Sequence, residues 1–98
     1  MGIWFGRNAN NRSYKYSDKL AKRIERKGGR TSTGASVLLD MMACKIEPGQ
    51  LRGEEAEQAA RSLTEVAPKL RRGDREVVLA IARDAEEASD VGSWTLYA

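Results

Sequence analysis

Basic and aromatic side chains alternate in the first third of the chain, and this combination could bind nucleic acid. The residues of the pattern are Arg12, Tyr14, Lys15, Tyr16, Lys19, Lys22, Arg23 and Arg26. Lysine and arginine neutralise phosphate groups, while tyrosine rings stack on unpaired bases. The pattern is unspecific, because a solvated polar loop followed by an ordinary wet helix face has the same composition. It therefore indicates a candidate polyanion-binding surface and leaves an ordinary surface as the alternative.

The charge of the chain is unevenly distributed. Residues 1–30 hold nine lysines and arginines against two acidic residues, whereas the rest of the chain holds eight against twelve. Glu86, Glu87 and Asp90 fall at the C-terminal end of a predicted helix, where the helix dipole disfavours negative charge. A second hypothesis for the basic face is therefore that it docks on these three carboxylates.

All six aromatic residues fall in the first sixteen or the last five positions. Four of them form a candidate interface: Trp4, Phe5, Trp94 and Tyr97. Either these rings cover one end of the helical core, or they form an exposed platform for a protein partner or a second copy of the chain. Large aromatic side chains are suited to the second role because they supply much contact area at low entropic cost.

The composition argues against common catalytic sites. The chain has no histidine and one cysteine, which excludes a zinc site of the usual composition and a Ser-His or Cys-His pair. Residues 29–36 have the glycine spacing of a phosphate-binding loop, but Ala35 stands where the phosphate-binding lysine should be. We expect Ser32 or Thr33 to cap a helix instead. We therefore expect no enzyme, no catalytic or metal-binding residue and no small-molecule cofactor.

The elements that must position these residues are mainly helical. Residues 54–89 predict an αα-hairpin, because apolar residues recur at steps of three and four. The positions are Ala56, Ala59, Ala60, Leu63, Val66, Ala67 and Leu70, then Val77, Val78, Ile81, Ala82, Ala85 and Ala88. Pro68 predicts that the first helix ends near Val66, and Asp74 is the predicted N-cap of the second, from about Arg75.

Two further helices are predicted before the hairpin. Residues 7–16 are expected to be a loop, and Ser17 is the expected cap of a helix that ends near Lys27. The next helix, about 34–45, is the most apolar. Cys44 shares a helical face with Val37 and Met41, which predicts a buried, inert thiol.

Residues 2–6 and 93–97 are the two strand-like runs, and we expect them to pair antiparallel. A two-stranded ribbon alone is marginal in water, so it must pack on the helices or continue across a dimer axis. The prediction is one domain spanning residues 1–98: a mainly α, four-helix domain around the acidic hairpin, with the basic third at its N-terminal side.

The leading hypothesis is a small non-enzymatic interaction module, acting through a protein partner or as a homodimer. The alternative is an accessory protein that binds nucleic acid through its basic first third. A single cysteine allows no internal disulfide, and no apolar run approaches 18 residues. We therefore expect a soluble cytoplasmic protein with no membrane partner.

Overall fold

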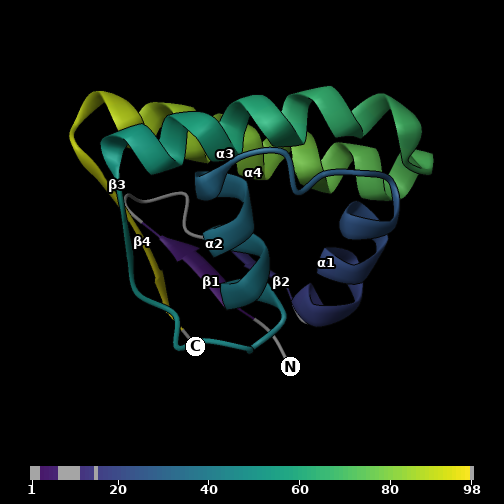
Figure 1. The fold of residues 1–98 in the computed structure, drawn as a ribbon, viewed down its shortest axis with the longest axis horizontal. Helices are drawn as coiled ribbons and strands as arrows, with labels where there is room; N and C mark the ends of the chain where they lie inside the picture. Colours follow the sequence, from purple (N-terminus) through teal and green to yellow (C-terminus); the bar gives the residue numbers. More distant parts are fainter. Residues whose placement is uncertain (1–2, 7–11, 15, 98) are drawn as a thin grey trace.

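The computed structural model describes residues 3–6, 12–14 and 16–97, with side chains for residues 16–96. This part of the chain is mainly α, with four helices and a short antiparallel sheet (Figure 1). In chain order the elements are β1 (Ile3–Gly6), β2 (Arg12–Tyr14), α1 (Ser17–Arg26), α2 (Thr33–Met42), β3 (Gln50–Arg52), α3 (Gly53–Val66), the short 3-10 helix η1 (Ala67–Lys69), α4 (Arg72–Asp90) and β4 (Ser93–Tyr97).

The sheet confirms the predicted pairing of the terminal strands. β1 and β4 run antiparallel, with Phe5 opposite Leu96. The sheet continues on both sides in the order β2-β1-β4-β3. The prediction of a loop over residues 7–16 was therefore wrong at Arg12–Tyr14, which pairs with β1. Strands of three residues are too short to carry a hydrophobic pattern, and their pairing is decided by the neighbouring strand.

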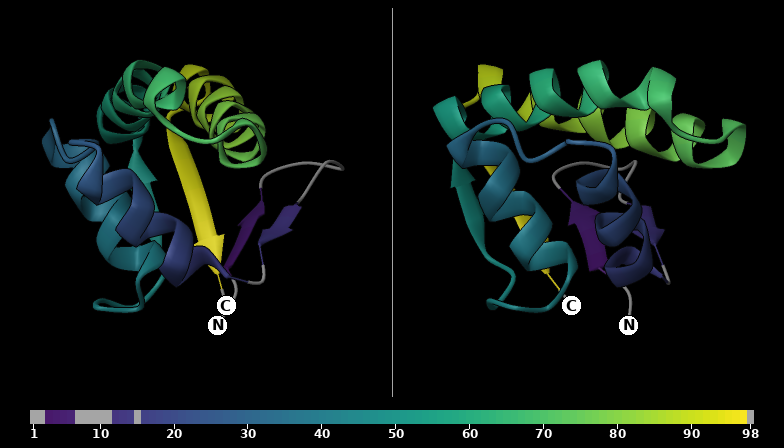
Figure 2. Two further views of the ribbon diagram at one scale, coloured as in Figure 1. Left: turned by 90° about the vertical axis from the view of Figure 1, so that its right-hand side faces the viewer. Right: turned by 45° about the vertical axis from the view of Figure 1, so that its right-hand side comes forward.

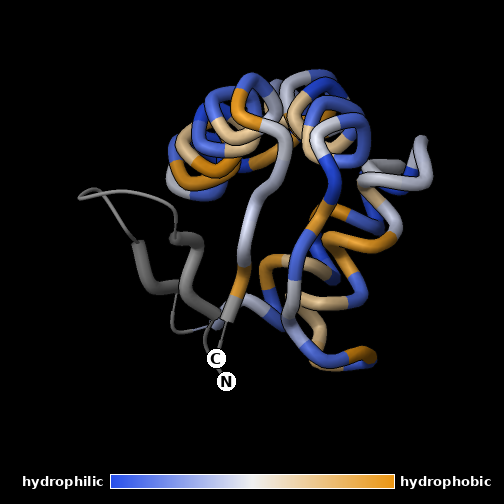
Figure 3. Tube along the Cα trace, turned by 90° about the vertical axis from the view of Figure 1, so that its left-hand side faces the viewer, coloured by the Kyte–Doolittle hydropathy of each residue, from blue (hydrophilic) through white to orange (hydrophobic). Residues whose placement is uncertain are grey.

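The helices cover one side and one end of the sheet. α3 and α4 lie next to each other across that end, and α1 and α2 lie on one side of the sheet (Figures 1 and 2). Along each helix, hydrophobic and hydrophilic segments alternate, as amphipathic packing requires (Figure 3). The predicted inward residues of the hairpin are buried except Val77, which is partly buried, and Leu63 and Ile81 are both fully covered.

The turn of the hairpin differs from the prediction at its second helix. α3 ends at Val66, as Pro68 predicts, but α4 begins at Arg72, and Arg71 occupies its N-cap position without a side-chain capping hydrogen bond. Asp74 is therefore not the N-cap; it lies in the first turn of α4 and binds Arg23 instead. Arg75 supplies hydrogen bonds to the backbone of the turn. Its guanidinium donates to the carbonyl oxygens of Ala67 and Leu70 at 3.3 and 3.2 Å.

Two further predictions were wrong at the ends of α1 and α2. Ser17 does not cap α1; it is the first helical residue, and its buried hydroxyl donates to the carbonyl oxygen of Met42 at 3.0 Å. α2 ends at Met42, so Cys44 lies beyond the helix with φ of 61° and an exposed side chain. The prediction of a buried thiol assumed a longer helix. Ser32 does cap α2, because its hydroxyl accepts from the N–H of Ala35 at 3.2 Å.

Candidate polyanion-binding surface

α1 presents its basic residues on the face opposite the core. Leu20, Ala21 and Ile24 are buried at steps of one, three and four, as expected for the inner face of a helix. Lys19, Lys22, Arg26 and Lys27 are exposed. We call these four residues the α1 basic face. Within the described residues, none of the four has an ion pair.

Arg23 makes the contact that joins α1 to α4. Its Nε and Nη2 donate to Oδ2 and Oδ1 of Asp74 at 2.6 and 3.0 Å, which is a two-point guanidinium–carboxylate contact. The hydrogen bond to Asp74 raises the pKa of Arg23 above its ordinary value. The hypothesis that α1 docks on Glu86, Glu87 and Asp90 was therefore wrong. Glu86 lies about 18 Å further along α4 than Asp74, and none of the three acids pairs with α1 within the described residues.

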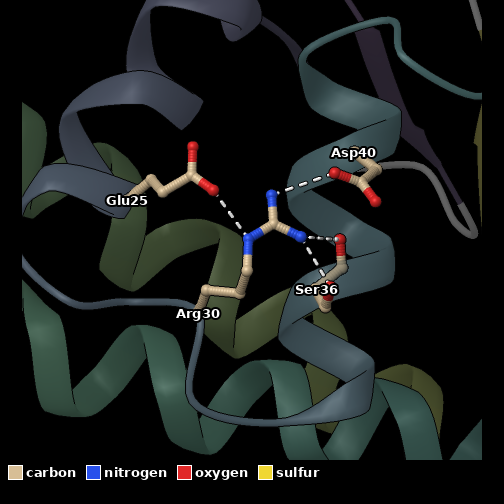
Figure 4. Close-up of polar contacts among 4 residues, drawn as sticks. All are labelled: Glu25, Arg30, Ser36 and Asp40. Atoms are coloured by element: carbon tan, nitrogen blue, oxygen red, sulfur yellow. Dashed lines mark hydrogen bonds and ion pairs between the residues drawn. The ribbon is translucent and has the colours of Figure 1, made fainter.

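Arg30 makes a second cluster, between α1 and α2 (Figure 4). Its guanidinium donates to Glu25 at 2.7 Å, to Asp40 at 2.9 Å and to the hydroxyl and carbonyl oxygens of Ser36. The hydrogen bond to Asp40, with a smaller one to Glu25, raises the pKa of Arg30. Since its donors are engaged by Glu25, Asp40 and Ser36, Arg30 does not belong to the α1 basic face.

In the loop with phosphate-loop glycine spacing, two backbone N–H groups donate to other residues of the chain. The N–H of Gly34 donates to Oε1 of Gln58 at 2.9 Å, and that of Ala35 donates to Ser32. These backbone donors would have to point at a ligand in a phosphate-binding loop. The geometry therefore agrees with the sequence in giving this loop a structural role.

Tyr16 lies beside the α1 basic face. Its side chain is 56% exposed, and the ammonium group of Lys19 lies 5.1 Å from the centre of its ring. This contact is a cation–π interaction at the surface. With this arrangement a base could stack on the ring of Tyr16 while its phosphate contacts the neighbouring cations.

The other predicted site residues are placed less fully. The backbones of Arg12 and Tyr14 lie in β2, which is an edge strand of the sheet. Their side chains and all of Lys15 lie outside the described residues, as do the side chains of Trp4, Phe5 and Tyr97. Trp94 is only 1% exposed and belongs to the core, together with Leu51 and Leu96. In this chain, therefore, the ring of Trp94 lies under the helices and does not form part of an exposed platform.

The sequence reasoning missed one basic group. Lys69, Arg71 and Arg72 are exposed at the start of α4, close to the residue that binds Arg23. The available signal was the run Lys69-Leu70-Arg71-Arg72, which directly follows the helix end predicted at Pro68. The contact between Arg23 and Asp74 shows that this run and α1 are neighbours.

Within the described residues, no group of three or more His, Cys, Asp or Glu side chains could hold a metal ion. In that same part of the chain, no helix has both the length and the apolar character needed to cross a membrane. Comparison of the chain with models of protein families, with curated proteins and with solved structures finds no match.

Proposed function

We propose that the chain is a non-enzymatic binding protein that holds nucleic acid on the α1 basic face. The supporting observation is that two carboxylates next to this face, those of Asp74 and Glu25, are already paired with arginines. Asp74 binds Arg23 and Glu25 binds Arg30. The four cations of the α1 basic face are left with no acidic partner within the described residues, so they attract an anion from outside.

Binding of this kind is driven by the release of counterions from phosphate groups. Each lysine or arginine that meets a phosphate contributes to the affinity, whichever base is nearby. The interaction is therefore largely independent of sequence, and its affinity falls steeply as the salt concentration rises.

A charge-reversal experiment tests the proposal. Lys22→Glu combined with Arg26→Glu removes two of the four cations. The matched control is Arg61→Glu combined with Arg83→Glu, which changes the net charge equally on exposed positions of α3 and α4. Fluorescence anisotropy with labelled single-stranded and double-stranded oligonucleotides, at about 50 and 200 mM salt, measures the affinity and its salt slope.

We expect the first double variant to weaken binding of every oligonucleotide and to flatten the salt slope by about 0.7–0.9 log units per lost contact. The control should keep most of the affinity. Three results would overturn the proposal: no binding by the unmodified protein at the lower salt concentration, an equal loss in the control, or a preference for polyglutamate over the oligonucleotides.

The second candidate is a protein partner, including a second copy of this chain. It is supported by the opposite charges at the two ends of α4, where Arg71 and Arg72 begin the helix and Glu86 and Glu87 lie near its end. Oppositely charged ends on one rigid element can pair between copies. Light scattering at low and high salt tests self-association, because a dimer formed this way should dissociate as the charges are screened. A mass that is monomeric at low salt would exclude self-association.

A further inference from the structure

The start of α4 carries an unusual group of cations. Lys69, Arg71 and Arg72 are exposed, and the contact of Arg72 with Glu76 is 3.8 Å long between side chains that are 92% and 73% exposed. Such exposed ion pairs contribute little stability. The helix dipole disfavours positive charge at the start of α4, where Arg71 and Arg72 lie, whereas Lys69 falls in the last turn of η1, where a cation is favoured. Stability of the helices therefore does not explain why Arg71 and Arg72 lie at the start of α4.

Arg75 differs from these three residues. Its guanidinium is directed back into the turn, where it donates to the carbonyl oxygens of Ala67 and Leu70. Arg75 therefore has a structural role, whereas Lys69, Arg71 and Arg72 are directed to solvent. We call these three residues the α4 basic group.

The α1 basic face and the α4 basic group are neighbours in space. Arg23 and Asp74, 51 positions apart in the chain, are in direct contact at 2.6 Å. Arg23 follows Lys22 directly, and Asp74 lies three residues after Arg71, which is less than one helical turn. The ribbon shows α1 next to the end of the helical hairpin where α4 begins (Figures 1 and 2).

We propose that a nucleic-acid strand bound on the α1 basic face continues onto the α4 basic group, so that the two form one binding site. This inference rests on the proposed function. The pair of Arg23 and Asp74 is then a positioning contact with two effects. It holds the two cationic groups next to each other, and it neutralises the carboxylate that would otherwise repel phosphate between them.

The length of the ligand tests this arrangement. Labelled oligothymidylates of about 5 and about 15 nucleotides are titrated by anisotropy at about 50 mM salt. Arg71→Glu is the test variant, and Arg83→Glu is its control, because Arg83 is exposed further along the same helix. Lys22→Glu reports on the α1 side.

We expect Lys22→Glu to weaken both strands. Arg71→Glu should weaken the long strand severalfold and lower its salt slope by about 0.7 log units, while it changes the short strand by less than about twofold. Arg83→Glu should leave both strands nearly unchanged. If Arg71→Glu and Arg83→Glu behave alike on the long strand, the inference is overturned while the proposed function stands. If the unmodified protein binds neither strand, the proposed function itself fails.

A second variant tests whether the ion pair positions the two basic groups, without a change in net charge. Arg23→Gln combined with Asp74→Asn removes the ion pair and leaves the net charge unchanged. If the pair positions the two groups, this variant should lose affinity for the long strand and keep it for the short one, with a circular-dichroism spectrum like that of the unmodified protein. An unchanged affinity for the long strand would overturn the positioning role. Arg71 has no side-chain hydrogen bond as the cap of α4, so Arg71→Glu keeps the inference testable should the double variant fold poorly.

Discussion

At the scale of single residues, three arginines of this chain have a role that none of the lysines of the α1 basic face has. Arg23, Arg30 and Arg75 each make several hydrogen bonds that join one element to another. The lysines of the α1 basic face make no ion pair within the described residues. The difference follows from the side chains: a guanidinium offers five donors in a fixed plane, whereas an ammonium group is a compact, strongly hydrated charge. The lysines of the α1 basic face, together with the exposed Arg26, are therefore left at the surface, where a ligand can reach them.

Arg30→Ala should lower the free energy of unfolding by roughly 1–2 kcal/mol, because it leaves Glu25, Asp40 and Ser36 without the charged donor that joins α1 to α2. Arg61→Ala is the matched control. Its partner Glu57 is one helical turn away and both side chains are mostly exposed, so the expected loss is below about 0.5 kcal/mol. Urea denaturation followed by circular dichroism measures both. Equal losses would show that the Arg30 cluster contributes no more than a surface pair.

Tyr16→Ala should reduce binding of single strands by roughly 1–3 kcal/mol per stacked base and leave duplex binding unchanged, because paired bases offer no open face to a side chain. Tyr16→Phe keeps the ring and should keep the affinity. The oligonucleotide titrations described above provide the measurement. A similar loss on single strands and duplexes would show that Tyr16 does not stack on bases.

At the scale of elements, the position of α2 against α3 depends on a few small polar residues. The hydroxyl of Ser62, buried in α3, is 2.7 Å from that of Thr31 and 3.0 Å from that of Ser32. Gly34, at the start of α2, lies so close to α3 that a Cβ there would collide with the carbonyl oxygen of Glu55. The first turn of α2 can therefore pack this closely on α3 only because residue 34 is glycine.

Gly34→Ala should destabilise the protein by about 1–3 kcal/mol or more, because the new methyl group meets backbone that cannot move without shifting a helix. Gly73→Ala is the control, since a Cβ at Gly73, in the first turn of α4, meets nothing within 4 Å. That variant should be neutral or stabilising by about 0.4–1 kcal/mol, because alanine reduces the freedom of the unfolded chain. Thermal unfolding of both variants is the measurement. A stable Gly34→Ala protein would mean that α2 and α3 are further apart than described.

At the scale of the whole molecule, the sheet closes the chain on itself. β4 lies between β1 and β3. In the described sheet β3 pairs with β4 alone, whereas β1 also pairs with β2. It also supplies Trp94 and Leu96, each 1% exposed, to the core beneath the helices. The last strand is therefore part of the core and not an addition to a finished helical domain.

Removal of residues 93–98 should abolish cooperative unfolding. Loss of a buried tryptophan alone costs about 3–5 kcal/mol, and a domain of this size has roughly 5–15 kcal/mol in all. Removal of residues 1–14, which takes away β1 and β2, leaves β4 paired with β3 and should lower the urea midpoint while a cooperative transition persists. Urea titrations of the two truncated proteins distinguish them. If removal of residues 93–98 lowers the urea midpoint less than removal of residues 1–14, the core does not depend on β4 more than on β1 and β2.

The sequence by itself determined the elements whose signals are local. The hairpin of α3 and α4 follows from apolar residues at helical spacing, and the end of α3 at Val66 follows from Pro68, which cannot continue the backbone hydrogen bonds. Ser32 as a helix cap and the two terminal strands were predictable for the same reason. Each depends on the conformation and hydrogen bonding of a few consecutive residues.

The tertiary structure decided what depends on residues far apart in the chain. β2 and β3 exist because a neighbouring strand offers hydrogen bonds, and three residues alone carry no such signal. Aspartate is a residue type that often caps helices. The carboxylate of Asp74 instead binds Arg23, which lies 51 positions away in the chain. The same contact places the α4 basic group beside the α1 basic face. A charged side chain pairs with whatever opposite charge the fold brings within reach, and that choice is made only when the helices pack.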